Sequence, residues 1–146
     1  MIALIQRVTQ GQITINNNVV AKITQGLVVL IAIQPLDNEK IAQRLIERLL
    51  GYRVFEDKQG KMNLNLKQQQ GGLLLVPQFT LAANTKKGLR PSFSSCAEPQ
   101  FAKILFETMV NKAKAQYQNT ESGIFSADML VSLVNDGPVT FWLEQH

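Results

Sequence analysis

Apolar and polar residues alternate along the first part of the chain in the pattern of β-strands. Residues 2–9 (IALIQRVT) and 11–15 (GQITI) show this alternation, and 19–23 (VVAKI) follows after the turn-forming run Asn16–Asn18. This arrangement predicts a β-hairpin. The unbroken apolar run 26–33 (GLVVLIAI) is typical of a central strand that is buried on both faces.

Apolar residues that recur every three or four positions predict two helices. The first follows Pro35 and ends at Gly51, and the second begins at Pro99, a residue suited to the first helical position. Each helix is expected to turn one apolar face to the core. These faces hold Ile41, Leu45 and Leu49 in the first helix, and Phe101, Leu105 and Met109 in the second.

The other apolar segments are short and predict further strands. They are 52–56, part of the polar connection 61–72, 73–81, 126–134 and 138–145, the last two separated by the turn sequence Asn-Asp-Gly-Pro. Strands therefore dominate the chain. Neighbours that resemble hairpins favour an α+β fold with a mixed or antiparallel sheet over a doubly wound one.

Composition narrows the class of protein. The chain has 146 residues, 45% hydrophobic and 18% charged, which suits one globular domain over residues 1–146. No apolar stretch spans a bilayer and the start lacks signal-peptide features, so a cytosolic location is expected. A single cysteine and a single histidine exclude a disulfide framework and the usual zinc ligand sets. Glycine-rich nucleotide loops are absent, and neither a metal nor a cofactor is expected.

The charge of the chain changes this picture only slightly. A formal net charge of +4 is compatible with an anionic partner, and equally with a solvated basic surface. Lys86, Lys87 and Arg90 are the candidates for binding nucleic acid, because they fall in a glycine-containing, loop-like stretch. Arg44 and Arg48 lie four residues apart on the first predicted helix and are expected to face water.

Two segments contain residues that packing alone does not require. The apolar run 73–81 (LLLVPQFTL) carries Pro77, and proline confines a strand to an edge, a bulge or an end. The segment 135–140 (NDGPVT) is interpreted first as a turn between strands. An X-Pro bond also has an accessible cis form, which would point consecutive carbonyls in an unusual direction. Both segments suit a backbone that is presented to a ligand.

Together with MIALIQRVT, LLGYRVFED, GKMNLN and RPSF, these two segments resemble the D-aminoacyl-tRNA deacylase family of bacterial type. The similarity runs in order over essentially the whole chain. Signature segments of that family, Ser-Gln-Phe-Thr-Leu and Asn-x-Gly-Pro-Val-Thr, correspond here to 77–81 and 135–140. The resemblance implies a compact, barrel-like β-rich fold with two main helices and a cytosolic homodimer. It also implies hydrolysis of the ester that joins a D-amino acid, or glycine mischarged on tRNA(Ala), to the terminal adenosine of tRNA.

The resemblance further implies roles for single residues. Gly137 and Pro138 would form a cis pair that crosses the dimer interface, holds the α-amino group and excludes an L side chain. Discrimination is strong when the wrong substrate must collide with the site. Backbone amides of Gln78, Phe79 and Thr80 would face the scissile carbonyl, a role worth about 2.7–4 kcal/mol per donor in other enzymes.

Thr80 is the obvious nucleophile, but its neighbours in the sequence include no base. The only histidine is His146, at the other end of the sequence. We therefore favour a mechanism in which Thr80 positions the substrate while the ribose 2′-OH of the tRNA and a water assist hydrolysis. A base distant in sequence is the alternative.

Other candidate residues have a structural interpretation beside the functional one. By the resemblance Arg7 would hold the Gly-Pro loop, and an ordinary surface ion pair explains it equally well. Phe125 and Met129 correspond to residues that line the adenine pocket, yet their spacing is explained more simply by core packing. Cys96 has no histidine near it in sequence and is not expected to be a nucleophile.

Pro77 departs from the bacterial pattern, which has serine there, and so removes a hydroxyl and a backbone N–H. A proline at this position also resembles an animal branch that removes L-alanine from a mismatched tRNA. That branch, however, changes the phenylalanine and the Gly-Pro surroundings that are kept here. We expect D-aminoacyl specificity, with Pro77 tuning rate or selectivity. A noncatalytic nucleic-acid-binding module and an L-aminoacyl-tRNA editing enzyme stay open as alternatives.

Overall fold

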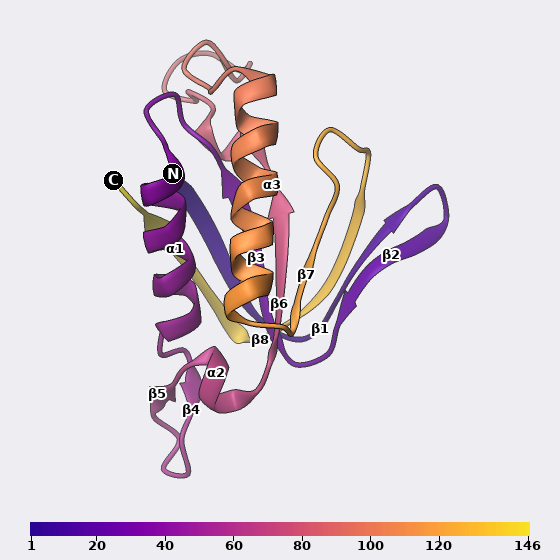
Figure 1. The fold of residues 1–146 in the computed structure, drawn as a ribbon, viewed down its shortest axis with the longest axis vertical. Coiled ribbons are helices and arrows are strands. Elements are labelled where there is room, and N and C mark those ends of the chain that lie inside the picture. The colour runs from indigo at the N-terminus through magenta and orange to yellow at the C-terminus, as the bar shows by residue number, and fades with distance from the viewer.

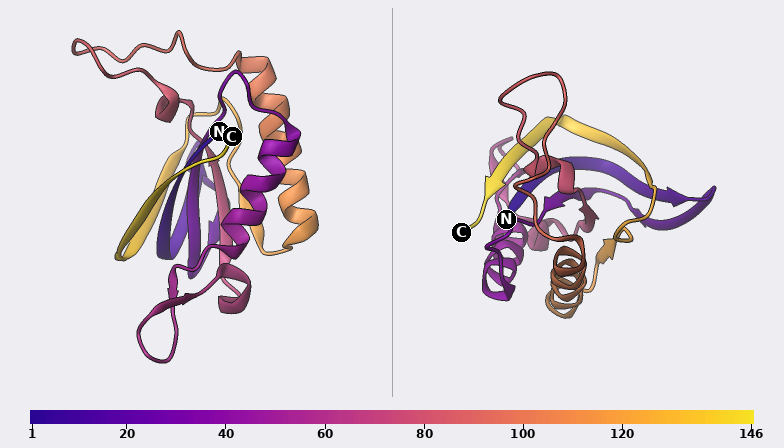
Figure 2. Two further views of the ribbon diagram at one scale, coloured as in Figure 1. Left: turned by 90° about the vertical axis from the view of Figure 1, so that its left-hand side faces the viewer. Right: turned by 90° about the horizontal axis from the view of Figure 1, so that it is seen from above.

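The computed structural model describes residues 1–146 and shows a curved sheet with two long helices on one side (Figure 1). The sheet is nearly closed, so the expected β-rich, barrel-like α+β fold is confirmed (Figure 2). Its strands are β1 (Ile2–Ile15), β2 (Asn18–Ile23), β3 (Gly26–Ala32), β6 (Gly72–Pro77), β7 (Thr120–Ser122) and β8 (Leu130–Glu144). The order is β2-β1-β3-β6-β7, with β8 paired to β1. Because β6 runs parallel to β3 and β7 while the other pairs are antiparallel, the sheet is mixed, one of the two arrangements that the sequence favoured.

The long first strand joins two segments that the sequence presents separately. β1 pairs with β3 through its first half and with β2 through its second half, while β8 follows it along the other side. The predicted hairpin between β1 and β2 is confirmed. Asn16 and Asn17 close it with φ angles of 48° and 62°, a conformation that asparagine tolerates better than most residues.

The last strand contradicts the prediction of two strands separated by a turn. β8 is continuous, and it begins at Leu130 rather than at residue 126. Thr140 pairs with Gln6 and Asn135 with Val8, so residues 136–139 loop out opposite a single residue of β1. Extra residues on one strand form a bulge that bends the strand without reversing it. The NDGP sequence therefore displays a loop on an unbroken strand.

Both main helices begin, and the first one ends, close to where the sequence predicts. α1 (Glu39–Gly51) is capped by Asn38, whose Oδ1 accepts from the N–H groups of Lys40 and Ile41 at 3.0 and 3.1 Å. α3 (Pro99–Gln116) starts at the predicted proline. The remaining elements are short: β4 (Phe55–Glu56), β5 (Met62–Leu64), α2 (Leu66–Gln69) and a 3₁₀ turn η1 (Phe79–Ala82). No helix is both long and apolar enough to cross a membrane.

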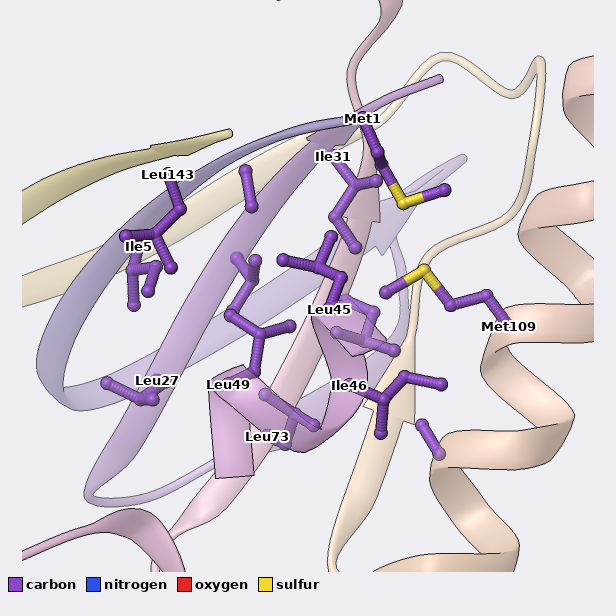
Figure 3. Close-up of a cluster of buried hydrophobic side chains, with 14 of the residues drawn as sticks. Met1, Ile5, Leu27, Ile31, Leu45, Ile46, Leu49, Leu73, Met109 and Leu143 are labelled. Atoms are coloured by element: carbon purple, nitrogen blue, oxygen red, sulfur yellow. The ribbon is translucent and has the colours of Figure 1, made fainter. Parts of the chain in front are cut away.

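Hydrophobic side chains pack on both faces of the sheet. The larger cluster lies between the sheet and the two long helices and includes Leu45, Leu49 and Met109, all fully buried (Figure 3). A smaller cluster fills the opposite face, inside the curl of the sheet. Phe101 corrects the expected helix face, since it is exposed. Steps of four residues rotate by about 40° each on a helix of 3.6 residues per turn, so Phe101 turns away while Leu105 stays buried.

Candidate active site

The unusual run after β6 forms one side of the site. Pro77 is the last residue of β6 and pairs with Ile31 of β3, while β7 on the other side pairs only with Leu73–Leu75. A proline is tolerated here because no strand on that side requires its missing N–H. Gln78 donates its N–H to the Ile31 carbonyl at 2.7 Å, and the chain then turns into η1. The strand thus ends by presenting Phe79 and Thr80, both exposed.

The side chains of this run are held by local contacts. The Gln78 amide Nε2 donates to Thr80 Oγ1 at 2.5 Å. Phe79 packs against Phe93, with ring centroids 5.2 Å apart. The amides of Phe79 and Thr80 begin a 3₁₀ turn, and the first N–H groups of a helical turn have no acceptor within it. They can therefore donate to an external oxygen.

Two cavities open beside these residues. The outer cavity, of about 290 Å³, is lined by Gln78, Phe79, Phe125 and Met129 among others. The inner cavity, of about 170 Å³, extends from Phe79 and Phe125 towards Phe106 of α3 and is mostly apolar. Phe125 and Met129 also touch the hydrophobic clusters, so both residues line a cavity and pack against the core.

The loop on β8 has a constrained backbone. The Gly137–Pro138 peptide bond is cis, and both residues are exposed. Gly137 has a φ of +130°, and a Cβ placed on it would lie 2.6 Å from Val139 Cγ2, so only glycine fits there. Asn135 spans the loop: its Oδ1 accepts from the Val139 N–H at 2.8 Å, and its Nδ2 donates to Thr140 Oγ1 at 2.9 Å.

Arg7 ties this loop to the body of the protein. Its Nε donates to the carbonyl of Asp136 at 3.1 Å, and its Nη1 donates to the carbonyl of Val54 at 2.8 Å. The same guanidinium lies 3.1 Å from the Asp136 carboxylate and 3.7 Å from that of Glu56. The Arg7 side chain is only 6% exposed, whereas those of Asp136 and Glu56 are 39% and 57% exposed, so a buried guanidinium is paired with carboxylates at the surface.

Within one chain, the Gly137–Pro138 loop lies far from the run Gln78-Phe79-Thr80. The Gly137–Pro138 loop sits opposite Arg7, whose β3 partner is Leu27, whereas Gln78 bonds to Ile31. Leu27 and Ile31 are separated along β3 by about 13 Å, at roughly 3.3 Å per residue. Three strand spacings from β8 to β6, about 4.8 Å each, add to this separation. One chain therefore does not bring Gly137–Pro138 to Phe79 and Thr80.

Known proteins resemble this chain over its whole length. The sequence model of the D-Tyr-tRNA(Tyr) deacylase family matches residues 4–144. The chain belongs to this family. Curated relatives named D-aminoacyl-tRNA deacylase, from Escherichia coli (strain K12 / DH10B) and Shigella boydii serotype 18, are 54% identical over 144 residues, 99% of this chain and 99% of theirs. Because deacylases are hydrolases, the expectation of an enzyme of this family is confirmed.

Solved structures agree on the fold of this deacylase family member. The structure of a protein named "c-Myc DNA Unwinding Element Binding Protein" has a TM-score of 0.93 and 33% identity, covering 99% of this chain and 98% of its own. Another, of a probable eukaryotic D-amino acid tRNA deacylase, has a TM-score of 0.86 and covers 97% of each chain. Its identity of 15% supports the shared fold alone.

The Thr80 hydroxyl is hydrogen-bonded to the Gln78 amide and to no acid or base, and one carboxylate, that of Asp128, lines the outer cavity together with Gln78 and Phe79. His146 lies 3.5 Å from Glu144 at the other end of β8, and no cluster of three potential metal ligands is present. Groups with shifted pKa values lie elsewhere: hydrogen bonds led by the one from Asn63 lower the pKa of Asp57, and burial raises the pKa of Tyr117. Cys96, predicted to be inert, has its Sγ 3.9 Å from the Phe79 carbonyl oxygen.

The structure also places the basic candidate residues and two residues that the sequence analysis missed. Lys86, Lys87 and Arg90 are exposed in the segment between η1 and α3, which projects from the body of the deacylase (Figure 2). Ser126 was not predicted, yet it lines both cavities with a φ of 62°. No local sequence signal identifies it. Asn135 was also missed, although its place in the NDGPVT segment marked it.

Proposed function

We propose that this deacylase hydrolyses the ester bond of D-aminoacyl-tRNA, and of glycyl-tRNA mischarged on tRNA(Ala), to release free tRNA and the amino acid. The observation that carries the proposal is the outer cavity, which meets the Gln78-Phe79-Thr80 run at the end of β6. Relatives that are 54% identical are named D-aminoacyl-tRNA deacylase, which supports the first of these two substrates. Hydrolysis takes place on tRNA in the cytosol, the location expected from the sequence.

The backbone of the Gln78-Phe79-Thr80 run would stabilise the transition state. Water adds to the ester carbonyl, the amides of Phe79 and Thr80 donate to the oxyanion, and the bond to the ribose 3′ oxygen breaks as that oxygen takes a proton. Thr80 positions the substrate, because its hydroxyl is held by the Gln78 amide and is hydrogen-bonded to no base. The ribose 2′-OH assists the water. The adenine would occupy the outer cavity between Phe125 and Met129.

A second copy of the chain would supply the chiral filter. Gly137 and Pro138 are exposed and lie far from Phe79 within one chain, so the loop is free to enter a partner's site. There its carbonyls would hold the α-amino group, and its backbone would collide with an L side chain. The outer edge of β8 supports such a dimer, because it has no strand partner and exposes Leu130, Val134 and Trp142.

The basic residues would bind the tRNA itself. Lys86, Lys87 and Arg90 form no ion pair within the chain and follow η1 closely in sequence. Unpaired cations next to the reacting end suit the phosphates of the substrate. The 33% identical relative of known structure is named as a DNA-binding protein, which keeps a noncatalytic binding module as the second candidate function.

Hydrolysis of matched D-tyrosyl-tRNA and L-tyrosyl-tRNA by the purified protein tests the proposal. We expect release of D-tyrosine alone, and release of glycine from glycyl-tRNA(Ala). The variant Gly137→Ala should lose at least about a hundredfold in kcat/KM on the D substrate, because its Cβ would collide with Val139. Gly60→Ala is the matched control, since Gly60 also has a positive φ and no atom within 4 Å of the added Cβ.

The alternatives make different predictions for the same assay. A binding module would retain tRNA and release no amino acid, while Gly60→Ala and Gly137→Ala would bind equally well. An L-aminoacyl editor would release L-tyrosine or, with the corresponding tRNA, L-alanine. Either result would overturn the proposed function.

A further inference from the structure

Residues 84–92 form a hairpin that we call the arm. Asn84 and Ser92 exchange both backbone hydrogen bonds, at 2.8 and 3.0 Å, which closes a narrow neck. The Asn84 side chain accepts from the Lys86 N–H at 3.0 Å, and Gly88 turns the tip with a φ of +72°. Figure 2 shows this part of the chain projecting beyond the sheet and the helices. The arm is therefore a defined projection with a closed base.

The tip of the arm combines unpaired positive charge with an apolar side chain. Lys86, Lys87 and Arg90 are exposed, and the sequence contains no acidic residue between Asp57 and Glu98. Leu89 lies among them with a relative exposure of 104%, so it touches almost nothing in its own chain. Nucleic acids offer both partners that such a tip lacks, a row of phosphates and the apolar faces of bases.

The base of the arm touches the residues proposed to act on the ester. Phe93, the residue after the neck, packs its ring on Phe79, and the Cys96 Sγ lies 3.9 Å from the Phe79 carbonyl oxygen. The position of the neck and the position of Phe79 are thus set by shared contacts. A nucleic acid held by the tip would be placed relative to the site.

We propose that the arm is an RNA-docking element that grips the acceptor stem of the tRNA next to its 3′ end, an inference that rests on the proposed function. Lys86, Lys87 and Arg90 contact phosphates, and Leu89 packs against the exposed face of a base at the end of the stem. Phe93 is a positioning residue that links the docked arm to Phe79. A second copy of the chain is a poorer occupant, because two arms brought together across a dimer axis repel each other.

Two substrates separate docking from chemistry. D-Tyrosyl-tRNA presents the stem, whereas 3′-O-(D-tyrosyl)adenosine presents the same ester without it. We compare Leu89→Ser and the triple variant Lys86→Gln/Lys87→Gln/Arg90→Gln with the unaltered protein. The control variant is Lys58→Gln/Lys61→Gln, in the exposed turn between β4 and β5 that projects at the opposite end of the molecule (Figure 1).

The tip variants should lose more activity on the substrate that contains the acceptor stem than on the one that lacks it. For both tip variants we expect kcat/KM to fall at least about tenfold more on the tRNA substrate than on the adenosine ester, mainly through KM. The slope of log KM against log salt should shrink by about one unit for each phosphate that the triple variant no longer binds. The Lys58/Lys61 variant should match the unaltered protein on both substrates.

Phe93 should behave differently from the tip. Phe93→Ala releases Phe79 and should lower kcat on both substrates, whereas Phe93→Tyr keeps the ring contact and should restore kcat. Equal losses on both substrates for the tip variants, or no loss on either, would overturn the arm as a docking element. A shift from dimer to monomer in sedimentation of Leu89→Ser would assign the tip to subunit contact instead.

The experiment also distinguishes an error in the proposed function from an error in the docking proposal. If the unaltered protein hydrolyses neither substrate, the deacylase proposal falls, and the arm is judged by its affinity for uncharged tRNA. Weakening by at least about tenfold in the tip variants, with the Lys58/Lys61 control unchanged, then supports the arm. Equal affinity of all variants refutes it.

Discussion

Single residues in this deacylase both pack in the interior and hold backbone groups of other segments in place. Arg7 illustrates this, because it is almost fully buried and yet directs its bonds to carbonyl groups of Val54 and Asp136 at 2.8 and 3.1 Å. A buried guanidinium needs partners for its donors, and here those partners belong to the Gly137–Pro138 loop and to the segment before β4. The loop is therefore held by a side chain from another strand.

Removing Arg7 should weaken both the fold and the activity. Arg7→Ala leaves the buried Val54 carbonyl without its donor, so we expect the free energy of unfolding to drop by about 2 kcal/mol. The Asp136 carboxylate is 39% exposed and is solvated by water in the variant. Arg7→Lys keeps the charge but lacks the fork that reaches both carbonyls, and should lose activity with less loss of stability. Urea titration and D-tyrosyl-tRNA hydrolysis measure the two effects. Arg44→Ala, at an exposed position on α1, is the control and should change neither.

Pro77 provides a second prediction for a single residue. β7 does not reach Pro77, and Pro77 lines both cavities, so its ring acts on the site more than on the sheet. Pro77→Ser should change stability by only about 0.5–1 kcal/mol while changing kcat/KM or the ratio of D-tyrosyl to glycyl hydrolysis. Unchanged kinetics on both substrates would show that the proline has no role in the site.

Elements of the fold differ in how far local sequence determines them. The capping of α1 by Asn38 and the turn at Asn16 and Asn17 involve residues a few positions apart. The short strand predicted within the connection 61–72 is β5, and the helix α2 that follows it has a capping box between Asn65 and Gln68, a local signal that the sequence analysis missed. By contrast, β8 is one strand because it pairs with β1 from Ile2 to Thr14, almost the whole length of β1.

The turn between β4 and β5 provides a prediction at the scale of one element. Asp57 accepts from the Asn63 amide and from the N–H groups of Lys61 and Gln59, and these bonds hold its pKa below the ordinary value. A lowered pKa stabilises the folded state above the unfolded value of about 3.9 and loses this effect as pH falls through the folded value. Asp57→Asn should thus lower the urea midpoint at pH 7, and the difference should vanish below the folded pKa. If the difference in urea midpoint persists at acidic pH, its cause is the shape of the side chain and not its charge.

At the scale of the whole molecule, the proposed site is incomplete in one chain. The Gly137–Pro138 loop and the Phe79–Thr80 run lie at different ends of the sheet, and the exposed edge of β8 has no partner. A closed two-fold dimer would place each loop in the other chain's cavity, so that each site contains residues from both chains.

Mixing two defective variants tests this arrangement directly. Gly137→Ala damages the loop and Phe79→Ala damages the cavity, so each homodimer should be nearly inactive. After the chains are unfolded and refolded together, about half of the dimers are mixed, and each mixed dimer has one intact site, which should restore about one quarter of the original activity. If activity does not return while mixed dimers form, both segments act within the same chain.

Sequence and tertiary structure each determined a different part of this protein. The sequence alone predicted the hairpin, both main helices, the β-rich α+β class and the two segments of chemical interest, because caps, turns and apolar periods depend on residues close together along the chain. Tertiary structure decided that β8 is continuous, that Arg7 is buried, that Phe125 and Phe79 share a cavity, and that the two segments lie apart. Those features depend on pairs such as Ile2 with Glu144, whose contact is set by packing and hydrogen bonding between distant strands and leaves no local pattern.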